Sequence, residues 1–248
     1  MKAILETEDL VKYYGEGENQ VRAIDHTSMQ VQHGEFVAVV GRSGSGKSTL
    51  LHMLGGLDRP DSGKVYIEGR DIFALKDEQL AVFRRRKIGF IFQDYNLMPA
   101  LNVWENIVLP IGLDGKKVKK DFVLDIVKSI GMEDRLHAMP NQLSGGQKQR
   151  LSIARAIAKK PEIFIFDDSF SALDFKTDST LRKALKEHTK DATTIIVAQR
   201  ISTILNADKI IVLDDGHMAG IGTHGELMKN CEVYRQIAMS QLSEEELA

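Results

Sequence analysis

The stretch Gly41-Arg42-Ser43-Gly44-Ser45-Gly46-Lys47-Ser48-Thr49 decides the fold, because it fits the pattern G-x-x-x-x-G-K-[ST] throughout. An apolar run of strand length, residues 35–40, precedes it, and residues 49–54 follow as a helix start. The glycines let the backbone wrap a phosphate chain and point N–H groups at it, and the new helix adds the positive end of its dipole. A glycine-rich turn before a helix is the other interpretation, but it does not require a lysine and two hydroxyls at this spacing.

Four side chains extend this chemistry to the terminal phosphates, a metal ion and a water molecule. Lys47 can reach the β- and γ-phosphates of a nucleotide, and the Ser48 hydroxyl can ligate Mg²⁺. A buried-type strand, residues 163–166, ends in Asp167-Asp168. Asp167 is placed to hold Mg²⁺ through water, and Asp168 stands where a base for the attacking water would sit. A pair of solvated carboxylates capping the next helix is the alternative, which the phosphate loop upstream disfavours.

A second phosphate-binding pattern occurs in Leu143-Ser144-Gly145-Gly146-Gln147, a hydroxyl and two glycines that open a helix. One phosphate loop already serves one nucleotide, so this pattern suggests a nucleotide held by another subunit. Gln93 ends the strand at residues 88–92, and polar residues at such strand ends face the ligand crevice of open α/β sheets. Either Tyr13 or Tyr14 can stack on a nucleobase, although packing on an edge strand explains them equally well.

Local patterns predict several further elements. Short apolar runs before residue 40 predict antiparallel strands. Asn102 looks like the cap of a helix that Pro110 ends. Phe122, Ile126, Val127 and Ile130 form the apolar face of a predicted helix that Gly131 closes. Other predicted helices are residues 77–86, 177–188 and 226–238.

Composition limits the possible functions. The 248 residues carry 33 basic and 35 acidic side chains, and the net charge of -2 gives no electrostatic footprint for nucleic acid. One cysteine, Cys231, excludes an internal disulfide and fits a reducing compartment. The amino terminus does not resemble a signal peptide, and the longest apolar runs are far shorter than a membrane span. We therefore expect any membrane role to come through a partner.

The chain resembles the ATP-binding subunit of an ABC transporter over essentially its whole length. The resemblance rests on four motifs in this order: the phosphate loop, Gln93, residues 143–147 and residues 163–168. The resemblance implies an α/β P-loop NTPase of ABC type, with a RecA-like mixed sheet core, an antiparallel β subdomain and a helical subdomain. It places the core and β subdomain at residues 1–93 and 161–248, and the helical subdomain at about 94–160. It implies one ABC ATP-binding domain over residues 1–248.

The resemblance also implies a ligand set and partners. Two domains dimerise head to tail, as homodimer or heterodimer, and each ATP lies between one chain's phosphate loop and the other's signature at 143–147. Tyr14 is the adenine-stacking residue, Gln93 touches Mg²⁺ and water, Asp174 belongs to the dimer-spanning turn, and Gln199 lies at the switch position. The implied location is the cytoplasmic face of the cell membrane, on transmembrane transporter subunits. The ATP-binding residues of the phosphate loop are Gly41, Ser43, Gly44, Ser45, Gly46, Lys47, Ser48 and Thr49.

The chain departs from the family at two of these positions. The family usually has Glu where Asp168 stands and His where Gln199 stands. Both changes are similar to the degenerate subunit of heterodimeric ABC exporters, which keeps an intact signature for its partner's site. This resemblance predicts slow ATP hydrolysis.

The two halves of the chain resemble different branches of the family. Residues up to about 142 are similar to stand-alone ATPases of lipoprotein-releasing, macrolide-efflux and peptide-antibiotic-resistance systems, with residues 84–90 and 140–143 as the cues. From Lys148 onward, residues 149–156 and 168–174 are similar to multidrug or lipid exporters. This contrast suggests a chimera joined near 143–147, engineered or a natural mosaic.

Two functions from different classes remain at this stage. The first is an ATP-hydrolysing domain that powers transport through separate membrane subunits, and the second is an ATP-dependent dimerisation switch with negligible turnover. A DNA-repair or chromosome-structure ATPase would need a long heptad insertion, and a translation factor would need two tandem copies. The sequence has neither.

Overall fold

The computed structural model describes residues 3–168 and 192–242. The chain forms two compact units: Met1–Leu80 with Thr193–Ala248, and Ala81–Ala192. This division does not test the predicted boundaries of the helical subdomain, about 94–160, which remain a prediction. The predicted helix at 177–188 and Asp174 lie outside the described residues.

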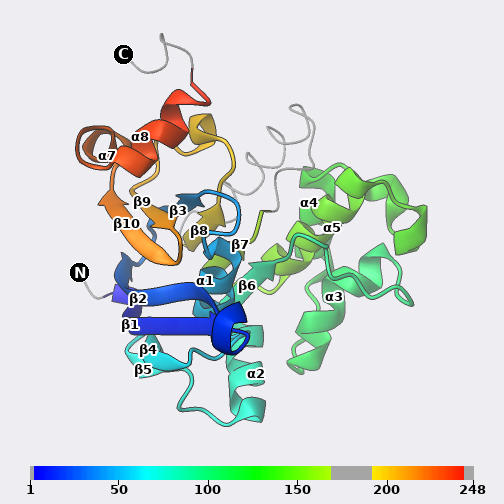
Figure 1. Ribbon diagram of the computed structural model, residues 1–248. Coiled ribbons are helices and arrows are strands. Elements are labelled where there is room, and N and C mark those ends of the chain that lie inside the picture. Colours follow the sequence, from blue (N-terminus) through cyan, green and yellow to red (C-terminus); the bar gives the residue numbers. More distant parts are fainter. Residues whose placement is uncertain (1–2, 169–191, 243–248) are drawn as a thin grey trace. The chain divides into compact units, whose positions relative to one another are not determined.

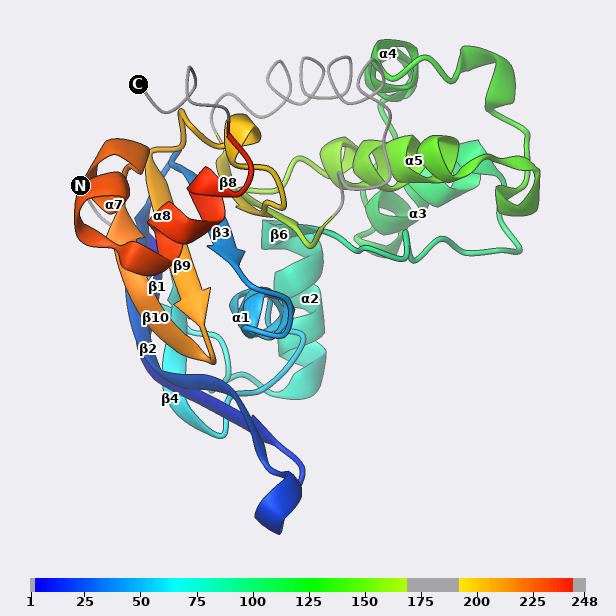
Figure 2. The same ribbon diagram turned by 45° about the horizontal axis from the view of Figure 1, so that its top comes forward.

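The first unit contains an antiparallel sheet built on a long hairpin (Figure 1). Its strands lie in the order β2, β1, β4, β5, and the amino-terminal strands expected from the sequence are confirmed. Figure 2 shows the short helix η1 (Gly17–Asn19) at the far end of the β1–β2 hairpin. The strand bounds are β1 Ala3–Tyr14, β2 Val21–Gln32, β4 Ser62–Ile67 and β5 Arg70–Asp71.

A second group of strands in the first unit is mainly parallel. β3 pairs in parallel with both β8 and β9, and β10 is antiparallel to β9. The three parallel strands are apolar and almost wholly buried, as strands covered on both faces are. The bounds are β3 Phe36–Gly41, β8 Thr193–Val197, β9 Lys209–Asp214 and β10 His217–Gly222.

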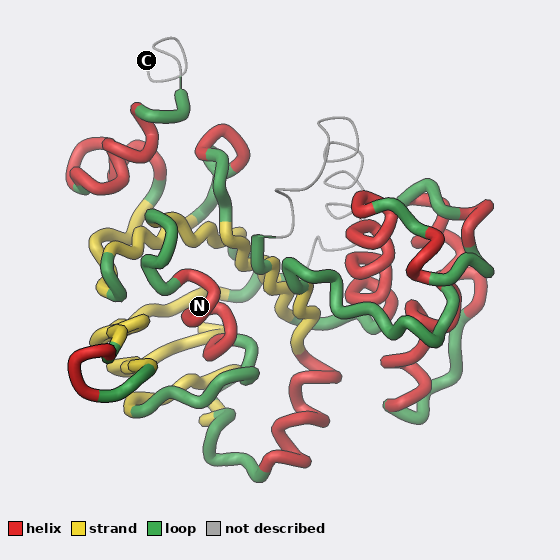
Figure 3. The backbone as a smooth tube through the Cα atoms, turned by 45° about the vertical axis from the view of Figure 1, so that its right-hand side comes forward, coloured by secondary structure: helices red, strands yellow, loops and turns green. Residues whose placement is uncertain are grey.

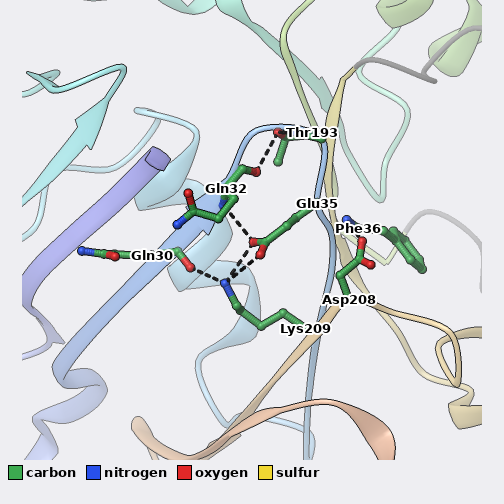
Figure 4. Close-up of polar contacts among 8 residues, drawn as sticks. Gln30, Gln32, Glu35, Phe36, Thr193, Asp208 and Lys209 are labelled. Carbon is green, nitrogen blue, oxygen red and sulfur yellow. Dashed lines mark hydrogen bonds and ion pairs between the residues drawn. The ribbon is translucent and has the colours of Figure 1, made fainter. Parts of the chain in front are cut away.

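An ion-pair cluster joins these strands where they begin (Figure 4). The Lys209 ammonium donates to the Gln30 carbonyl at 2.7 Å and to the Glu35 carboxylate at 2.9 Å. The same carboxylate accepts from the Gln32 backbone N–H at 2.8 Å. At the neighbouring strand, the Thr193 hydroxyl accepts from the Gly34 N–H at 2.9 Å. The cluster therefore fixes the strand ends opposite the phosphate loop.

The helices of the first unit differ in one respect from the prediction. α1 (Lys47–Leu54) follows the phosphate loop as expected. The predicted terminal helix at 226–238 is wrong as a single element, because it is two helices, α7 (His224–Asn230) and α8 (Glu232–Met239), divided at Cys231. Cys231 has an extended backbone, with φ -122° and ψ 107°, and its side chain is buried.

The second unit contains the parallel pair β6 (Ile88–Ile91) and β7 (Ile163–Phe166), together with most of α2 (Asp77–Lys87). Its other helices, coloured red in Figure 3, include α4 and α3, both of which pack against α5. The helix bounds are α3 Val103–Leu113, α4 Lys120–Ser129 and α5 Gly145–Ala158, with short turns η2 Glu133–Arg135 and η3 Pro140–Gln142.

The prediction that Pro110 ends the helix capped by Asn102 is wrong. Asn102 does cap α3, in a capping box with Glu105, but the helix continues through Pro110 to Leu113. Proline removes one N–H donor from the helix ladder. The buried side chains of Ile107 and Ile111 lie one turn apart around it, and burial of that second turn offsets the lost hydrogen bond.

Candidate functional site

The phosphate loop runs from the end of β3 to the start of α1, in the strand–loop–helix context that the pattern requires. Gly46 has φ 95°, and a Cβ there would overlap the carbonyl oxygen of Ala23. A Cβ at Gly41 would lie 2.5 Å from the Ser45 hydroxyl oxygen. The loop backbone thus packs where side chains do not fit, and Ser43, Gly44 and Ser48 are exposed to solvent.

The Lys47 side chain folds over this loop. Its ammonium donates to the carbonyl oxygens of Gly41 at 3.0 Å and Arg42 at 2.7 Å. Ser45, which is 2% exposed, lies beneath it at 3.5 Å. The cap of α1 is Gly46, which makes no side-chain hydrogen bond to the helix end. A positive charge above a glycine-lined loop at a helix amino terminus fits a polyphosphate chain.

Tyr14 lies at the end of β1, where it contacts the same region. Its hydroxyl donates to Asp58 at 2.6 Å and also makes a side-chain hydrogen bond with Thr49 in α1. Burial and the Asp58 hydrogen bond raise the pKa of Tyr14. The side chain is 42% exposed. The neighbouring Tyr13 hydroxyl instead donates to Asp25 at 2.6 Å. Of the two tyrosines left open by the sequence, Tyr14 is therefore the one placed beside the phosphate loop.

Gln199 is brought to the same edge of the first unit. It follows β8 and is exposed, and the preceding Ala198 donates its N–H to the Val39 carbonyl at 3.1 Å. Val39 and Val197 are register partners in the parallel β3–β8 pair. Since carboxyl ends of parallel strands share an edge, Gln199 and the phosphate loop emerge at the same edge.

In the second unit, the residues after β6 and β7 are also adjacent. Ile91 and Phe166 are register partners, and the Asp167 N–H donates to the Ile91 carbonyl at 3.0 Å. Asp167 is 5% exposed, whereas Gln93, two residues beyond β6, is exposed. The structure therefore brings Gln93 to the strand end that carries the two aspartates.

Asp168 differs from its neighbour in backbone geometry. Its φ of 45° lies in the left-handed region, which aspartate tolerates better than longer side chains. Among residues 3–168 and 192–242, no group of three or more His, Cys, Asp or Glu side chains forms a metal cage. The expected donors Ser48, Gln93 and Asp167 carry side-chain oxygens, which are the ligands that Mg²⁺ prefers.

The signature forms the amino end of α5 as predicted. Ser144 is the cap: its hydroxyl accepts from the Gln147 N–H at 3.3 Å, and the Gln147 side chain accepts from the Ser144 N–H at 2.8 Å. A hydroxyl that accepts one hydrogen bond still has its proton to donate. Ser144 and Gly145 are exposed, so this helix end can receive a phosphate from outside the chain.

Arg155 is a residue that the sequence analysis did not single out. It donates from α5 to the carbonyl oxygens of Tyr95 at 2.9 Å and Asn96 at 2.6 Å. Both acceptor residues have positive φ, 62° and 50°. Burial lowers the pKa of Arg155, although an arginine remains charged at neutral pH. The side chain therefore ties the segment after Gln93 to the signature helix. A lone arginine in the apolar run 153–158 was the available signal.

The expected site residues thus divide between the two units. Tyr14, residues 41–49 and Gln199 belong to the first unit, and Gln93, Asp167–Asp168 and the signature on α5 belong to the second. No helix in the described ranges 3–168 and 192–242 is long and apolar enough to cross a membrane.

Comparisons with known proteins agree with a phosphate loop on an α/β scaffold. The protein-family model described as ABC transporter matches residues 24–171. A solved structure described as "Dimeric structure of a post-hydrolysis state of the ATP-binding cassette MJ0796 bound to ADP and Pi" has a TM-score of 0.83 and 36% identity, covering 88% of this chain and 98% of that one. These findings confirm the predicted fold class, an ABC-type P-loop NTPase.

Relatives of two lengths also match. An "Uncharacterized ABC transporter ATP-binding protein" of Thermotoga maritima is 42% identical over 228 residues, which is 91% of this chain and 97% of the relative. "Macrolide export ATP-binding/permease protein MacB" of Hyphomonas neptunium is 38% identical over 216 residues. That match covers 86% of this chain but 34% of MacB, so the chain spans about a third of its length. The chain belongs to the ABC transporter ATP-binding family.

Proposed function

We propose that this chain binds and hydrolyses ATP to power a transporter whose membrane-spanning part lies on separate subunits. The observation that carries the proposal is the phosphate loop, in which Lys47 folds over the backbone and Gly41 and Gly46 lie where a side chain does not fit. The similarity to the ATP-binding cassette MJ0796, which is described as bound to ADP and Pi, supports ATP as the nucleotide.

The expected site residues then have separate roles in nucleotide binding. The N–H groups of residues 41–49 surround the phosphates, and Lys47 exchanges its carbonyl partners for phosphate oxygens. The exposed ring of Tyr14 stacks on adenine. Mg²⁺, held by Ser48, Gln93 and Asp167, supplies charge neutralisation at the terminal phosphates.

Hydrolysis rests on Asp168, Gln199 and Gln93. Asp168 acts as the base for the attacking water, which Gln93 helps to orient, and Gln199 donates its amide N–H to the γ-phosphate. An aspartate is one methylene shorter than the family's usual glutamate, and a glutamine amide carries no positive charge. We therefore propose that turnover is slow while ATP binding is normal.

The signature requires a second ATP-binding subunit in this proposal. Ser144, Gly145, Gly146 and Gln147 complete the partner's site, and Asp174 lies in the turn that spans the dimer. The words "dimeric" in the description of the MJ0796 cassette and "permease" in the name MacB support a dimer and a membrane partner. The chain then works at the cytoplasmic face of the membrane, as homodimer or heterodimer.

The experiment is phosphate release from ATP with and without Mg²⁺, beside light scattering with and without ATP. Mg²⁺-dependent release and an ATP-dependent dimer are the expected results. Ser144→Arg places bulk at the helix end and should oppose the dimer without weakening ATP binding to its own chain. A monomer at high ATP and protein concentration would contradict the proposed dimer.

A second candidate is an ATP-dependent dimerisation switch with negligible turnover. The observation that favours it is the pair Asp168 and Gln199, which replaces both residues that the family usually places on the water and the γ-phosphate. Normal ATP-linked dimerisation with no phosphate release above background would select this function.

The chimera remains a separate proposal about origin. Similarity to two kinds of protein supports it. The structure described as a bacterial Atm1-family ABC exporter is 30% identical, with a TM-score of 0.83, and the match covers 97% of this chain and 42% of that one. The other similarity is to MacB. One relative from Thermotoga maritima, however, matches 91% of the chain. Separate alignment of residues 1–142 and 148–248 tests the idea: a chimera requires different relatives to lead for each segment.

A further inference from the structure

A cavity of about 280 Å³ lies in the second unit, and none of the residues assigned above lines it. It is lined by the carboxyl end of α2, the end of α3 with the segment that leads to α4, and the carboxyl end of α5. α5 begins at Gly145, within the signature, and the cavity meets its last residue, Ala158, which lies 13 residues or about 20 Å further along the axis. It is therefore separate from the signature.

The lining is strongly basic. Seven lining residues are lysine or arginine, and Asp114 is its single acid. The whole chain has a net charge of -2, so this concentration of positive charge is a local feature.

Asp114 neutralises only part of this charge. Its carboxylate is 3% exposed and lies 2.6 Å from Arg86, 2.8 Å from Lys116 and 3.3 Å from Arg85. Lys116 and Arg86 hold the pKa of this carboxyl well below its usual range. One buried anion thus serves three cations, and the Arg85 Nε is buried without a hydrogen-bond partner among the described residues.

Four lining lysines have no acidic partner within ion-pair distance in the described part of the chain: Lys117, Lys119, Lys159 and Lys160. Lys160 lies 4.1 Å from the centroid of the Phe122 ring, and Lys159 is partly buried. Burial and the nearby Arg155 lower the pKa of Lys159 to about 8. The excess positive charge is therefore poorly compensated by the protein itself.

The carboxyl end of α5 accounts for part of this pattern, because lysines at a helix end interact favourably with its dipole. That explanation reaches Lys159 and Lys160 but not Lys117 and Lys119, which come from the segment before α4. Basic side chains from three separate segments line the same cavity. The dipole of α5 alone does not explain this arrangement.

We propose that this cavity binds a phosphate-bearing anion, a phosphate monoester or diphosphate group, at a second site distinct from the ATP site. Arg85 and Arg86 present guanidinium groups that recognise phosphate oxygens, and the lysines add point charges around them. The volume exceeds that of several water molecules at about 30 Å³ each, which leaves room for a phosphate with a small group attached. A free phosphate ester and a lipid headgroup share this chemistry.

Pyrophosphate is the probe, and calorimetric titration measures its binding to the intact chain. The phosphate loop also attracts pyrophosphate, so Lys47→Ala is the background that silences that site. In this background, the triple variant Lys117→Gln, Lys119→Gln, Lys159→Gln should lose at least tenfold in affinity. The matched control Lys64→Gln, Lys128→Gln, Lys229→Gln removes three exposed lysines outside the cavity and should change affinity by less than twofold.

Equal loss of pyrophosphate affinity in both triple variants would overturn the proposed anion site. Absence of pyrophosphate binding in the Lys47→Ala background would overturn it too. Circular dichroism checks that the variants fold. A second measurement needs no substitution in the cavity: in NMR titrations, pyrophosphate should raise the pKa of the Lys159 ammonium, and an unchanged pKa would contradict the proposal.

Vesicles distinguish the two sources of the phosphate group. Cosedimentation with phosphatidylglycerol vesicles, but not phosphatidylcholine vesicles, that is lost in the cavity variant would identify a lipid headgroup. Pyrophosphate binding without cosedimentation would identify a free phosphate ester. Cosedimentation that persists in the cavity variant, without pyrophosphate binding, would overturn the site.

Discussion

The phosphate loop and the carboxyl end of β7 differ in how closely their residues follow the family pattern. In the phosphate loop every position fits, and the packing around Gly41 and Gly46 excludes any other residue. At the end of β7, Asp167 is buried as the pattern requires, but Asp168 is a shorter residue in left-handed backbone. Under the proposed function, ATP binding and ATP hydrolysis depend on different residues, so we expect that each can change without the other.

The largest effect is expected in the phosphate loop. Gly46→Ala forces a Cβ onto the Ala23 carbonyl at a φ of 95°, and a penalty of about 3 kcal/mol lowers ATP affinity about a hundredfold. Gly44→Ala is the control, because φ is also positive but no atom lies within 4 Å of the added Cβ. Calorimetric titration with ATP compares the two. Equal affinities would show that packing does not determine the loop.

A gain in rate is expected at the end of β7 and at the switch position. Asp168→Glu moves the carboxylate roughly 1 Å further out, a distance that can change a rate about a hundredfold. Gln199→His should add to the gain, but less than additively, since both residues act on one water and one phosphate. Phosphate release by the parent, both single variants and the double variant measures this. Glu at φ 45° should also lower the free energy of unfolding by about 1 kcal/mol.

A smaller loss is expected from the hydrogen bonds of Arg155. Arg155→Met leaves the Tyr95 and Asn96 carbonyls without their donor, which loosens the segment after Gln93. We expect about a tenfold lower rate of phosphate release with unchanged ATP affinity, corresponding to about 1.4 kcal/mol. Arg150→Met is the matched control, since Arg150 on the same helix donates to Ile130 and Gly131 instead. The same loss in both variants would assign the effect to α5 as a whole.

The smallest effect on the reaction with ATP is expected at the opposite strand ends. Lys209→Met removes the charge shared by Glu35 and the Gln30 carbonyl, and should lower the free energy of unfolding by about 1–2 kcal/mol. ATP affinity should stay unchanged. Urea unfolding measures the loss, with the exposed Lys229→Met as control. A change in ATP affinity would show that this cluster is coupled to the site.

The sequence was most informative where spacing and physics agree. The phosphate loop, the buried strand β7 and the capped start of α5 follow from short patterns of glycine, apolar and hydroxyl residues. The break at Cys231 was missed because no glycine or proline marks it, and its burial beside Ala219 is a tertiary contact. Arg155 was missed for the same reason: its acceptors lie about 60 residues earlier in the chain.

The central claim is that this chain binds ATP normally and hydrolyses it slowly, and a single-turnover experiment tests it most directly. With the chain in excess over Mg-ATP, nucleotide retained on a filter and phosphate released are measured on the same sample. Nearly all ATP should be bound both in the parent and in the Asp168→Glu, Gln199→His variant, while phosphate release should be much slower in the parent. Equal release rates in the two proteins would contradict it.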